Sequence, residues 1–250
     1  MKRDRLKKLA AEKRFIPGIY NYCDRWCERC PLTSRCLNFS ISQEDSSDPE
    51  AQDIRNKAFW NKLSETLVES LELLKEGAKK WGVDLETLDS TEDIENLKAK
   101  NKAAENHLLS RAAKRYFEIV DDWFKERETL FFETVAAARE GVSLDETLEV
   151  IRWYQYFISA KIVRAVRGKV EDDEEGDDEF PRDSDGSAKI ALIAIDRSIA
   201  AWAVIRHYIT GGAEGVMDII AFLDGLRQAV EKAFPKARSF MRPGFDSMAK

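Results

Sequence analysis

The chain has 250 residues, of which 44% are hydrophobic and 10% aromatic. This is enough apolar material to bury the core of one large domain or two ordinary ones. Charged residues make up 34%, and no stretch approaches the roughly 18 unbroken apolar residues of a spanning helix, so the composition excludes a membrane protein. The basic N-terminal segment has no apolar signal-peptide region behind it. We therefore expect a folded cytoplasmic protein with no membrane partner.

The net charge of −6 is unevenly distributed along the chain. Residues 1–36 contain ten Lys or Arg and four Asp or Glu, a net charge of +6, so the other 214 residues carry −12. Ten acidic residues fall between Glu171 and Asp185. Such a run repels itself and buries no apolar surface, which predicts a solvated acidic loop over residues 170–187.

Outside this loop the pattern predicts helix almost throughout, because Gly and Pro are few and no period-2 apolar alternation is present. The first long helix is expected to start at Asp48-Pro49 and to end at Gly82. A second helical segment runs from the Ser90 capping box to Gly141. Because an unbroken helix of that length would measure about 70 Å, we expect a bend or break within residues 125–128.

Three further helices follow in the second half of the chain. A capping box formed by Ser143 and Glu146 opens a helix that is expected to end at Gly168. Residues 188–208 form the most apolar helix, which predicts the centre of a bundle. The last helix follows the turn at residues 211–212 and stops at Pro235. The predicted fold is all-α: a bundle of about five long helices over residues 48–250, preceded by a cysteine-rich metal-binding module in residues 1–47.

All four cysteines lie within the segment YNYCDRWCERCPLTSRCL, at Cys23, Cys27, Cys30 and Cys36. The spacing C-x3-C-x2-C-x5-C predicts a single metal site in a reducing compartment rather than a disulfide framework. Four thiolates complete either a four-iron cluster or a tetrahedral zinc site. Both sites would carry the same net charge, so the neighbouring arginines do not discriminate between them.

Geometry discriminates a little between the two cofactors. Zinc draws its sulfur atoms to within about 3.8 Å of one another, whereas a cubane holds them further apart. Cys23, Cys27 and Cys30 could share one helical stripe, but its outer members would then lie about 10 Å apart. A zinc site would therefore require a looped backbone here. Pro31 restricts Cys30 to an extended conformation, which would turn the chain so that Cys36 returns to the site.

The string CERCPLTSRCL, residues 27–37, resembles the C-x2-C-P-(V/L)-x3-C-L stretch of WhiB-like proteins, small actinobacterial iron–sulfur regulators. The resemblance implies that Cys27, Cys30 and Cys36 match the last three ligands of a [4Fe–4S] cluster. It covers about 11 residues. The first ligand of that family lies well upstream, whereas Cys23 precedes Cys27 by only four residues, and the family's glycine-rich tryptophan turn is absent. The resemblance thus supports the cofactor more than the regulatory function.

A second candidate site is the polar interruption at Asp196 within the most apolar helix. On an ideal helix Asp196 and His207 lie on one stripe with two alanines between them, a groove of small residues that could line a pocket. The alternative is a buried aspartate paired with Arg152 or Arg197. The chain carries no Glu-x-x-His pair, activated nucleophile or phosphate-binding glycine loop. The sequence therefore names no reaction, and whether the protein is an enzyme stays open.

The residues favour a metal-binding helical protein, and we expect a [4Fe–4S] cluster ahead of Zn(II). Such a protein would have a redox, sensing or electron-transfer role and could bind a protein or redox partner. A first alternative is a structural zinc module on a helical interaction scaffold. A second is a nucleic-acid-binding regulator, because the basic N-terminus interleaves arginines with Tyr20, Tyr22 and Trp26, which combines cationic charge with stacking surfaces.

Overall fold

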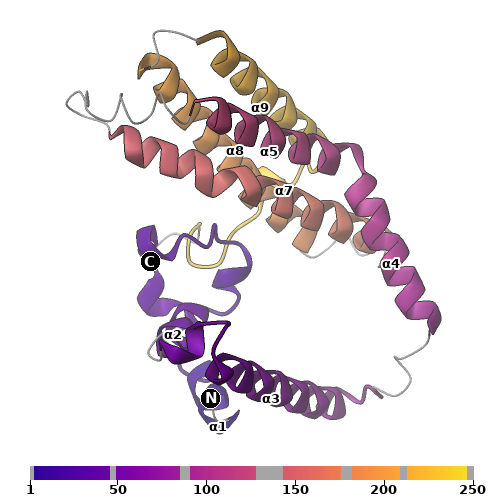
Figure 1. Cartoon of the computed structure of the whole chain (residues 1–250). Coiled ribbons are helices and arrows are strands. Elements are labelled where there is room, and N and C mark those ends of the chain that lie inside the picture. Colours follow the sequence, from indigo (N-terminus) through magenta and orange to yellow (C-terminus); the bar gives the residue numbers. More distant parts are fainter. Residues whose placement is uncertain are drawn as a thin grey trace. The chain divides into compact units, whose positions relative to one another are not determined.

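The structure is a computed structural model, and it describes residues 3–45, 49–84, 91–127, 143–175, 182–208 and 213–246. All regular structure in these segments is helical, with no strand (Figure 1). The predicted all-α class is confirmed. None of the described helices combines the length and apolarity needed to cross a membrane. Contacts divide the chain into two compact units, unit 1 with residues 1–97 and 242–250, and unit 2 with residues 98–241.

Unit 1 contains three α-helices, with short 3-10 turns between them. The helices are α1 (Arg3–Ala10), α2 (Leu37–Asp45) and α3 (Lys57–Trp81). Three 3-10 turns, η1 (Ile19–Asn21), η2 (Cys27–Arg29) and η3 (Thr33–Arg35), separate α1 from α2 and shape the cysteine segment. A fourth turn, η4 (Glu50–Gln52), precedes α3. Unit 1 therefore holds the cysteine segment together with the first long helix.

The ends of α3 show which terminal signal decided each boundary. The helix ends where the sequence predicted, at Gly82, which adopts the left-handed conformation with φ 71° that glycine tolerates best. Its start is Asn56, not Asp48-Pro49, because the Asn56 side chain accepts a hydrogen bond from the Ala58 N–H at 3.0 Å. Residue Asp53 is extended, which stops η4 from continuing into the helix.

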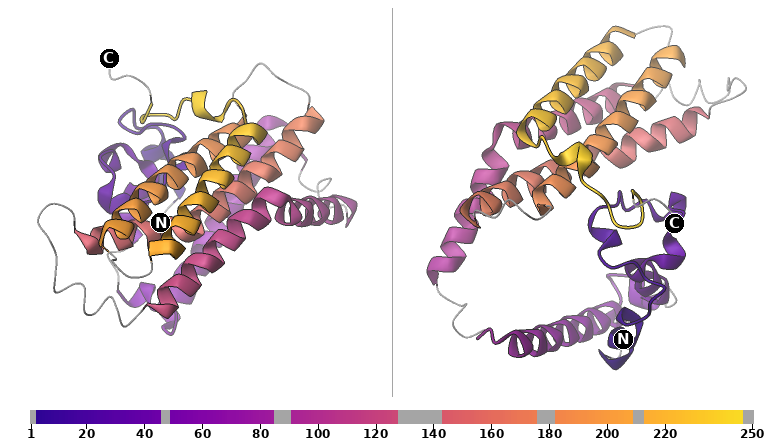
Figure 2. Two further views of the ribbon diagram at one scale, coloured as in Figure 1. Left: turned by 90° about the horizontal axis from the view of Figure 1, so that it is seen from above. Right: turned by 180° about the vertical axis from the view of Figure 1, so that it is seen from behind.

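Unit 2 is built on a bundle of four helices. They are α5 (Leu108–Glu126), α7 (Leu144–Glu175), α8 (Asp183–Tyr208) and α9 (Ala213–Ala233). Helix α7 packs against α5 and α8, and α9 packs against the same two helices, which closes the bundle (Figure 2). Helix α4 (Thr91–Asn106) leads into it. The bundle therefore has four members among the described residues where about five long helices were expected, and α3 belongs to unit 1.

A break at His107 was not foreseen. It separates α4 from α5 because the His107 backbone is extended and its Nδ1 accepts a hydrogen bond from the Leu109 N–H at 3.2 Å, which makes it the N-cap of α5. Helix α5 ends at Glu126, within the region where a break was expected. Ser90, the expected helix from residue 128 to Gly141, and the turn at residues 211–212 lie outside the described residues.

The acidic segment is more helical than expected. The capping box is confirmed, since the Glu146 N–H donates to Ser143 Oγ at 3.3 Å. However, α7 runs past Gly168 to Glu175, and α8 begins at Asp183, so helix enters the expected loop from both ends. Gly168 lies within α7 and packs beside Ser184 of α8, where an added Cβ would make ordinary van der Waals contacts at 3.4 to 3.5 Å, so this glycine does not end the helix.

A cluster of aromatic side chains lies within the largely aliphatic core of the bundle. Trp202 of α8 is fully buried, and its Nε1–H donates to the hydroxyl of buried Tyr116 at 3.1 Å. Trp123 packs edge-on against Trp202 with ring centroids 4.8 Å apart. These contacts join α5 to α8, and α8 also packs against both α7 and α9. The expectation that residues 188–208 form the central helix is thereby supported.

The C-terminal segment divides between the two units. The turn η7 (Ala237–Ser239) contacts α8, and the Lys189 ammonium donates to the carbonyl oxygens of Arg238 and Phe240, each at 2.9 Å. From Arg242 onward the chain belongs to unit 1. The last residues of the chain therefore contribute to the fold around the cysteines.

Candidate metal centre

The chain between Cys23 and Cys27 reverses sharply, so no single helix carries the cysteines. Asp24 Oδ1 accepts a hydrogen bond from the Trp26 N–H at 3.2 Å. Arg25 has φ 60°, a left-handed conformation that is uncommon for a residue with a side chain. The Cys27 N–H then donates to the Arg25 carbonyl at 3.0 Å, closing a three-residue turn. The backbone is looped, as a zinc site would require, and the helical-stripe arrangement is wrong.

The second half of the segment turns where the proline predicted. Cys30 is extended with φ −86° and ψ 121°, the conformation that Pro31 imposes on its predecessor. The turn η3 (Thr33–Arg35) follows, and the Cys36 N–H closes it by donating to the Thr33 carbonyl at 3.1 Å. The chain therefore returns to bring Cys36 to the same site.

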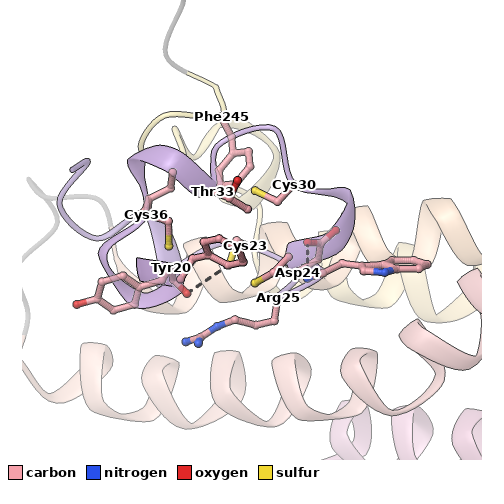
Figure 3. A pocket seen from close by; sticks show the side chains of 12 residues that line it. Tyr20, Cys23, Asp24, Arg25, Cys30, Thr33, Cys36 and Phe245 are labelled. Carbon is pink, nitrogen blue, oxygen red and sulfur yellow. Dashed lines mark hydrogen bonds between the residues drawn. The ribbon is translucent and has the colours of Figure 1, made fainter. Parts of the chain in front are cut away.

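All four cysteines line one pocket in unit 1. Figure 3 shows Cys23, Cys30 and Cys36 on separate turns around a common space, with the Cys23 thiol donating to the Tyr20 carbonyl at 3.6 Å. None of the four forms a disulfide. The cavity volume is about 20 Å³, room for about one water molecule. The fold thus brings the four predicted ligands together.

The walls of this pocket are largely apolar. They include Ile19, Trp26, Phe39 and Phe245, of which Ile19 and Trp26 are buried. An apolar shell restricts solvent access to a metal site and tunes its redox potential. The surroundings of the four sulfur atoms therefore suit a metal cofactor held away from bulk water.

The thiols also influence one another electrostatically. Burial raises the pKa of the Cys27 thiol above its ordinary value, and the neighbouring Cys23, Cys36, Glu28 and Cys30 raise it further. Converging thiols favour their protonated form because several thiolates in one place repel one another. A bound cation reverses this preference, since it deprotonates the thiols that coordinate it. The donor set therefore fits a thiophilic cation or cluster.

The described residues contain no group of three His, Cys, Asp or Glu side chains that is placed to hold one metal ion. The four cysteines share a pocket, yet their sulfur atoms are not gathered as around a single ion. A mononuclear site would require them to move inward.

The arginines between the cysteines contact aromatic rings. The Arg29 guanidinium lies 4.1 Å from the centre of the Trp26 ring, and that of Arg25 lies 6.0 Å from the centre of the Tyr20 ring. Trp26 is buried, so its ring is not available for stacking on a nucleic-acid base. One of the three aromatic residues that suggested nucleic-acid binding therefore serves the fold.

The C-terminal segment completes the pocket, which the sequence reasoning missed. Phe245 lines it, and Gly244 has φ 78° with space for no side chain, because a Cβ would lie 2.7 Å from Ile16 Cδ1 and 3.2 Å from Ile19 Cδ1. The apolar residues around the Pro243-Gly244 pair predict that the tail packs back onto the helical bundle, but from Arg242 onward it belongs to unit 1. Nothing local in the sequence indicated that it packs on the cysteine segment.

The second candidate site lies at the surface of the bundle. Asp196 is half-exposed and pairs with Arg238 at 2.6 Å and Arg227 at 3.7 Å, so the predicted pairing of a buried Asp196 with Arg152 or Arg197 is wrong. His207 is exposed, and so are the two alanines between them. Asp196, on the polar face of α8, forms ion pairs with Arg227 of α9 and Arg238 of η7, and the sequence of α8 alone does not indicate these partners. The residues from Asp196 to His207 on this face are part of the bundle surface.

No protein-family model matches the chain, and no curated protein or solved structure matches it either.

Proposed function

We propose that the four cysteines of unit 1 bind a [4Fe–4S] cluster and that the protein has a redox, sensing or electron-transfer role. The observation that carries the proposal is the convergence of Cys23, Cys27, Cys30 and Cys36 on one apolar-walled pocket. A cluster of this type takes one thiolate for each of its four irons. The chain provides that number in one place and no other cysteine.

Two further observations favour a cluster over a single ion. The sulfur atoms surround a shared space without forming a group placed to hold one ion, and a cubane needs its thiolates further apart than zinc does. The string over residues 27–37 also resembles an iron–sulfur motif. The spacing of the thiols and the local sequence therefore point to the same cofactor.

The size of unit 1's core supports a stabilising cofactor. Among the described residues of this unit, only Leu9, Phe15, Ile19, Trp26, Ala51 and Ala78 are buried hydrophobic residues. Small units with few buried side chains commonly depend on a metal or a disulfide for stability. Because a preformed site does not exist in the unfolded chain, cofactor binding contributes directly to folding.

A structural zinc site is the second candidate, and two observations favour it. The backbone is looped between Cys23 and Cys27, and the cavity volume of about 20 Å³ suits one ion better than four irons. Under this alternative the thiols close around Zn(II), and the protein acts as an interaction scaffold.

Anaerobic purification decides between the two candidates. The cluster predicts a brown protein with broad absorption near 400 nm, about four irons and four sulfides per chain and little zinc. Cys30→Ser should lose most of the bound iron, whereas Ser34→Ala, an exposed neighbour in the same loop, should keep it. A colourless protein with one equivalent of zinc would establish the zinc site instead, and a metal-free protein would exclude both.

A further inference from the structure

An exposed apolar stripe runs along α3, a helix that makes few contacts with the other elements of unit 1. Its members are Trp60, Leu63, Leu67, Val68, Leu71, Leu74 and Trp81, which are between 39% and 77% exposed. Single exposed apolar residues need no explanation, but a continuous patch of them marks an interaction surface. The stripe occupies most of the length of a 25-residue helix.

The exposed area matches what a stable interface needs. A fully exposed leucine or valine presents roughly 150–200 Å² and a tryptophan roughly 250 Å². At the observed exposures the stripe amounts to on the order of 800 Å², above the roughly 300–600 Å² of the largest patch on a typical monomer. Each partner in a standard protein interface buries about 800 Å². The stripe is therefore large enough to form one side of a specific dimer.

The order of residues within the stripe is that of a coiled-coil seam. Trp60, Leu67, Leu74 and Trp81 recur every seven residues, and Ser64 and Leu71 occupy the alternate seam positions between Trp60 and Leu74. The next such position, Ala78, is buried within unit 1. This alternating spacing of four and three residues keeps a seam facing a second helix along its whole length. The partner that fits such a seam is another helix of the same length.

We propose that the partner is α3 of a second copy of this chain, paired in an antiparallel orientation. In the antiparallel register Leu67 lies opposite Leu71 of the other copy and Leu74 lies opposite Ser64, which gives four central layers. Each of these layers joins a large side chain to a small one or two leucines to each other, which fills space evenly. A parallel pair would stack Trp60 on Trp60 and leave Ser64 facing Ser64. An antiparallel pair also has two-fold symmetry, so the same surface patch of each copy forms the interface and none of it is left exposed for a third copy.

The charges of α3 favour this partner over a membrane surface or a strongly charged protein. The helix carries five lysines and four glutamates, a net charge of +1, mixed along its polar face. Helices that bind membrane surfaces carry a predominantly basic polar face. Lys75 is the only charged residue at the positions that flank the seam, so two copies meet there with little repulsion.

Sedimentation equilibrium of the full-length protein in reducing buffer tests the dimer. At about 50 µM the wild type should have twice the chain mass of 28.6 kDa. The double variant L67D/L71D should be monomeric, with dimer affinity at least about 100-fold weaker, because four carboxylates would be buried in the central layers. Leu108→Asp is the matched control, since Leu108 is 75% exposed at the start of α5, and it should remain dimeric. A monomeric wild type, or an L67D/L71D dimer, would overturn the proposal.

Lysine cross-linking of the wild type tests the orientation and does not depend on any variant. Lys57 and Lys80 lie at opposite ends of α3, about 34 Å apart along the axis, beyond the reach of a short cross-linker within one copy. An antiparallel pair brings Lys57 close to Lys79 and Lys80 of the other copy. We expect cross-links between these positions. When ¹⁴N-labelled and ¹⁵N-labelled chains are combined, the cross-linked peptides should carry one label of each kind, which shows that the links join two copies. Links only from Lys57 to Lys57 would establish a parallel pair and overturn the proposed register.

Discussion

At the scale of single residues, the pair formed by Tyr116 and Trp202 makes the bundle sensitive to high pH. Burial raises the pKa of Tyr116 to about 12, so the folded state retains the phenol proton at pH values where the unfolded chain releases it. The stability that this provides is fully present below pH 10 and is lost as the pH rises from about 10 to about 12. Its upper limit, for two pKa units, is about 3 kcal/mol.

Tyr116→Phe should therefore flatten the decline of the free energy of unfolding between about pH 10 and 12. At pH 7 the same variant should be less stable by about 1 kcal/mol, because Trp202 loses its hydrogen-bond acceptor. Urea unfolding followed by tryptophan fluorescence measures both effects. Equal slopes against pH in the two proteins would show that Tyr116 does not contribute to the alkaline decline.

The need for glycine at position 244 follows from its positive φ and from the residues that pack beside it. Gly244→Ala should displace the tail from the pocket at a cost of about 1–2 kcal/mol, because of its positive φ and the 2.7 Å approach to Ile16. Thiol-reactive reagents should then label the cysteines about 5 to 30 times faster. Gly225→Ala is the control, since a Cβ there meets nothing within 4 Å, and it should leave the labelling rate unchanged. Identical labelling in both variants would contradict this role for Gly244.

At the scale of elements, local chemistry determined some helix ends and tertiary contacts determined others. Gly82 and the Ser143 capping box act within one turn of the chain, and both were predicted correctly from the sequence. Gly168 was assigned to a helix end because glycine is a frequent terminator. In the structure it lies within α7, beside Ser184 of α8, and the helix continues past it to Glu175 because α7 packs against α8.

The N-cap at His107 gives a prediction for α5. His107→Ala removes the acceptor of the Leu109 N–H and should lower the free energy of unfolding by about 1 kcal/mol. His107→Asp should match or exceed the wild type, because aspartate is a strong N-cap and its charge suits a helix N-terminus. Urea unfolding monitored by tryptophan fluorescence compares the three proteins. If the alanine variant were as stable as the wild type, the cap would have no energetic role.

At the scale of the whole molecule, the two units should respond differently to loss of the proposed cofactor. Cys30→Ser should increase amide hydrogen exchange in residues 15–40 and also in residues 242–246, because Phe245 lines the same pocket. Exchange in α5, α7, α8 and α9 should be almost unchanged, since these helices bury their own core. Mass-spectrometric exchange against the Ser34→Ala control measures this. Unchanged exchange in residues 242–246 would show that the tail is independent of the cysteine site.

The sequence by itself determined the helical class, the four cysteines of the site and the helix ends that depend on neighbouring residues. These properties follow from periodicity, residue chemistry and local hydrogen bonds, all of which act over a few positions. Only the tertiary structure decided that α3 leaves an apolar stripe exposed, that Asp196 pairs with Arg238 on the surface, and that the C-terminal segment completes the cysteine pocket. Each of these features depends on contacts between residues far apart in the chain. The packing of whole helices and turns decides which distant residues meet.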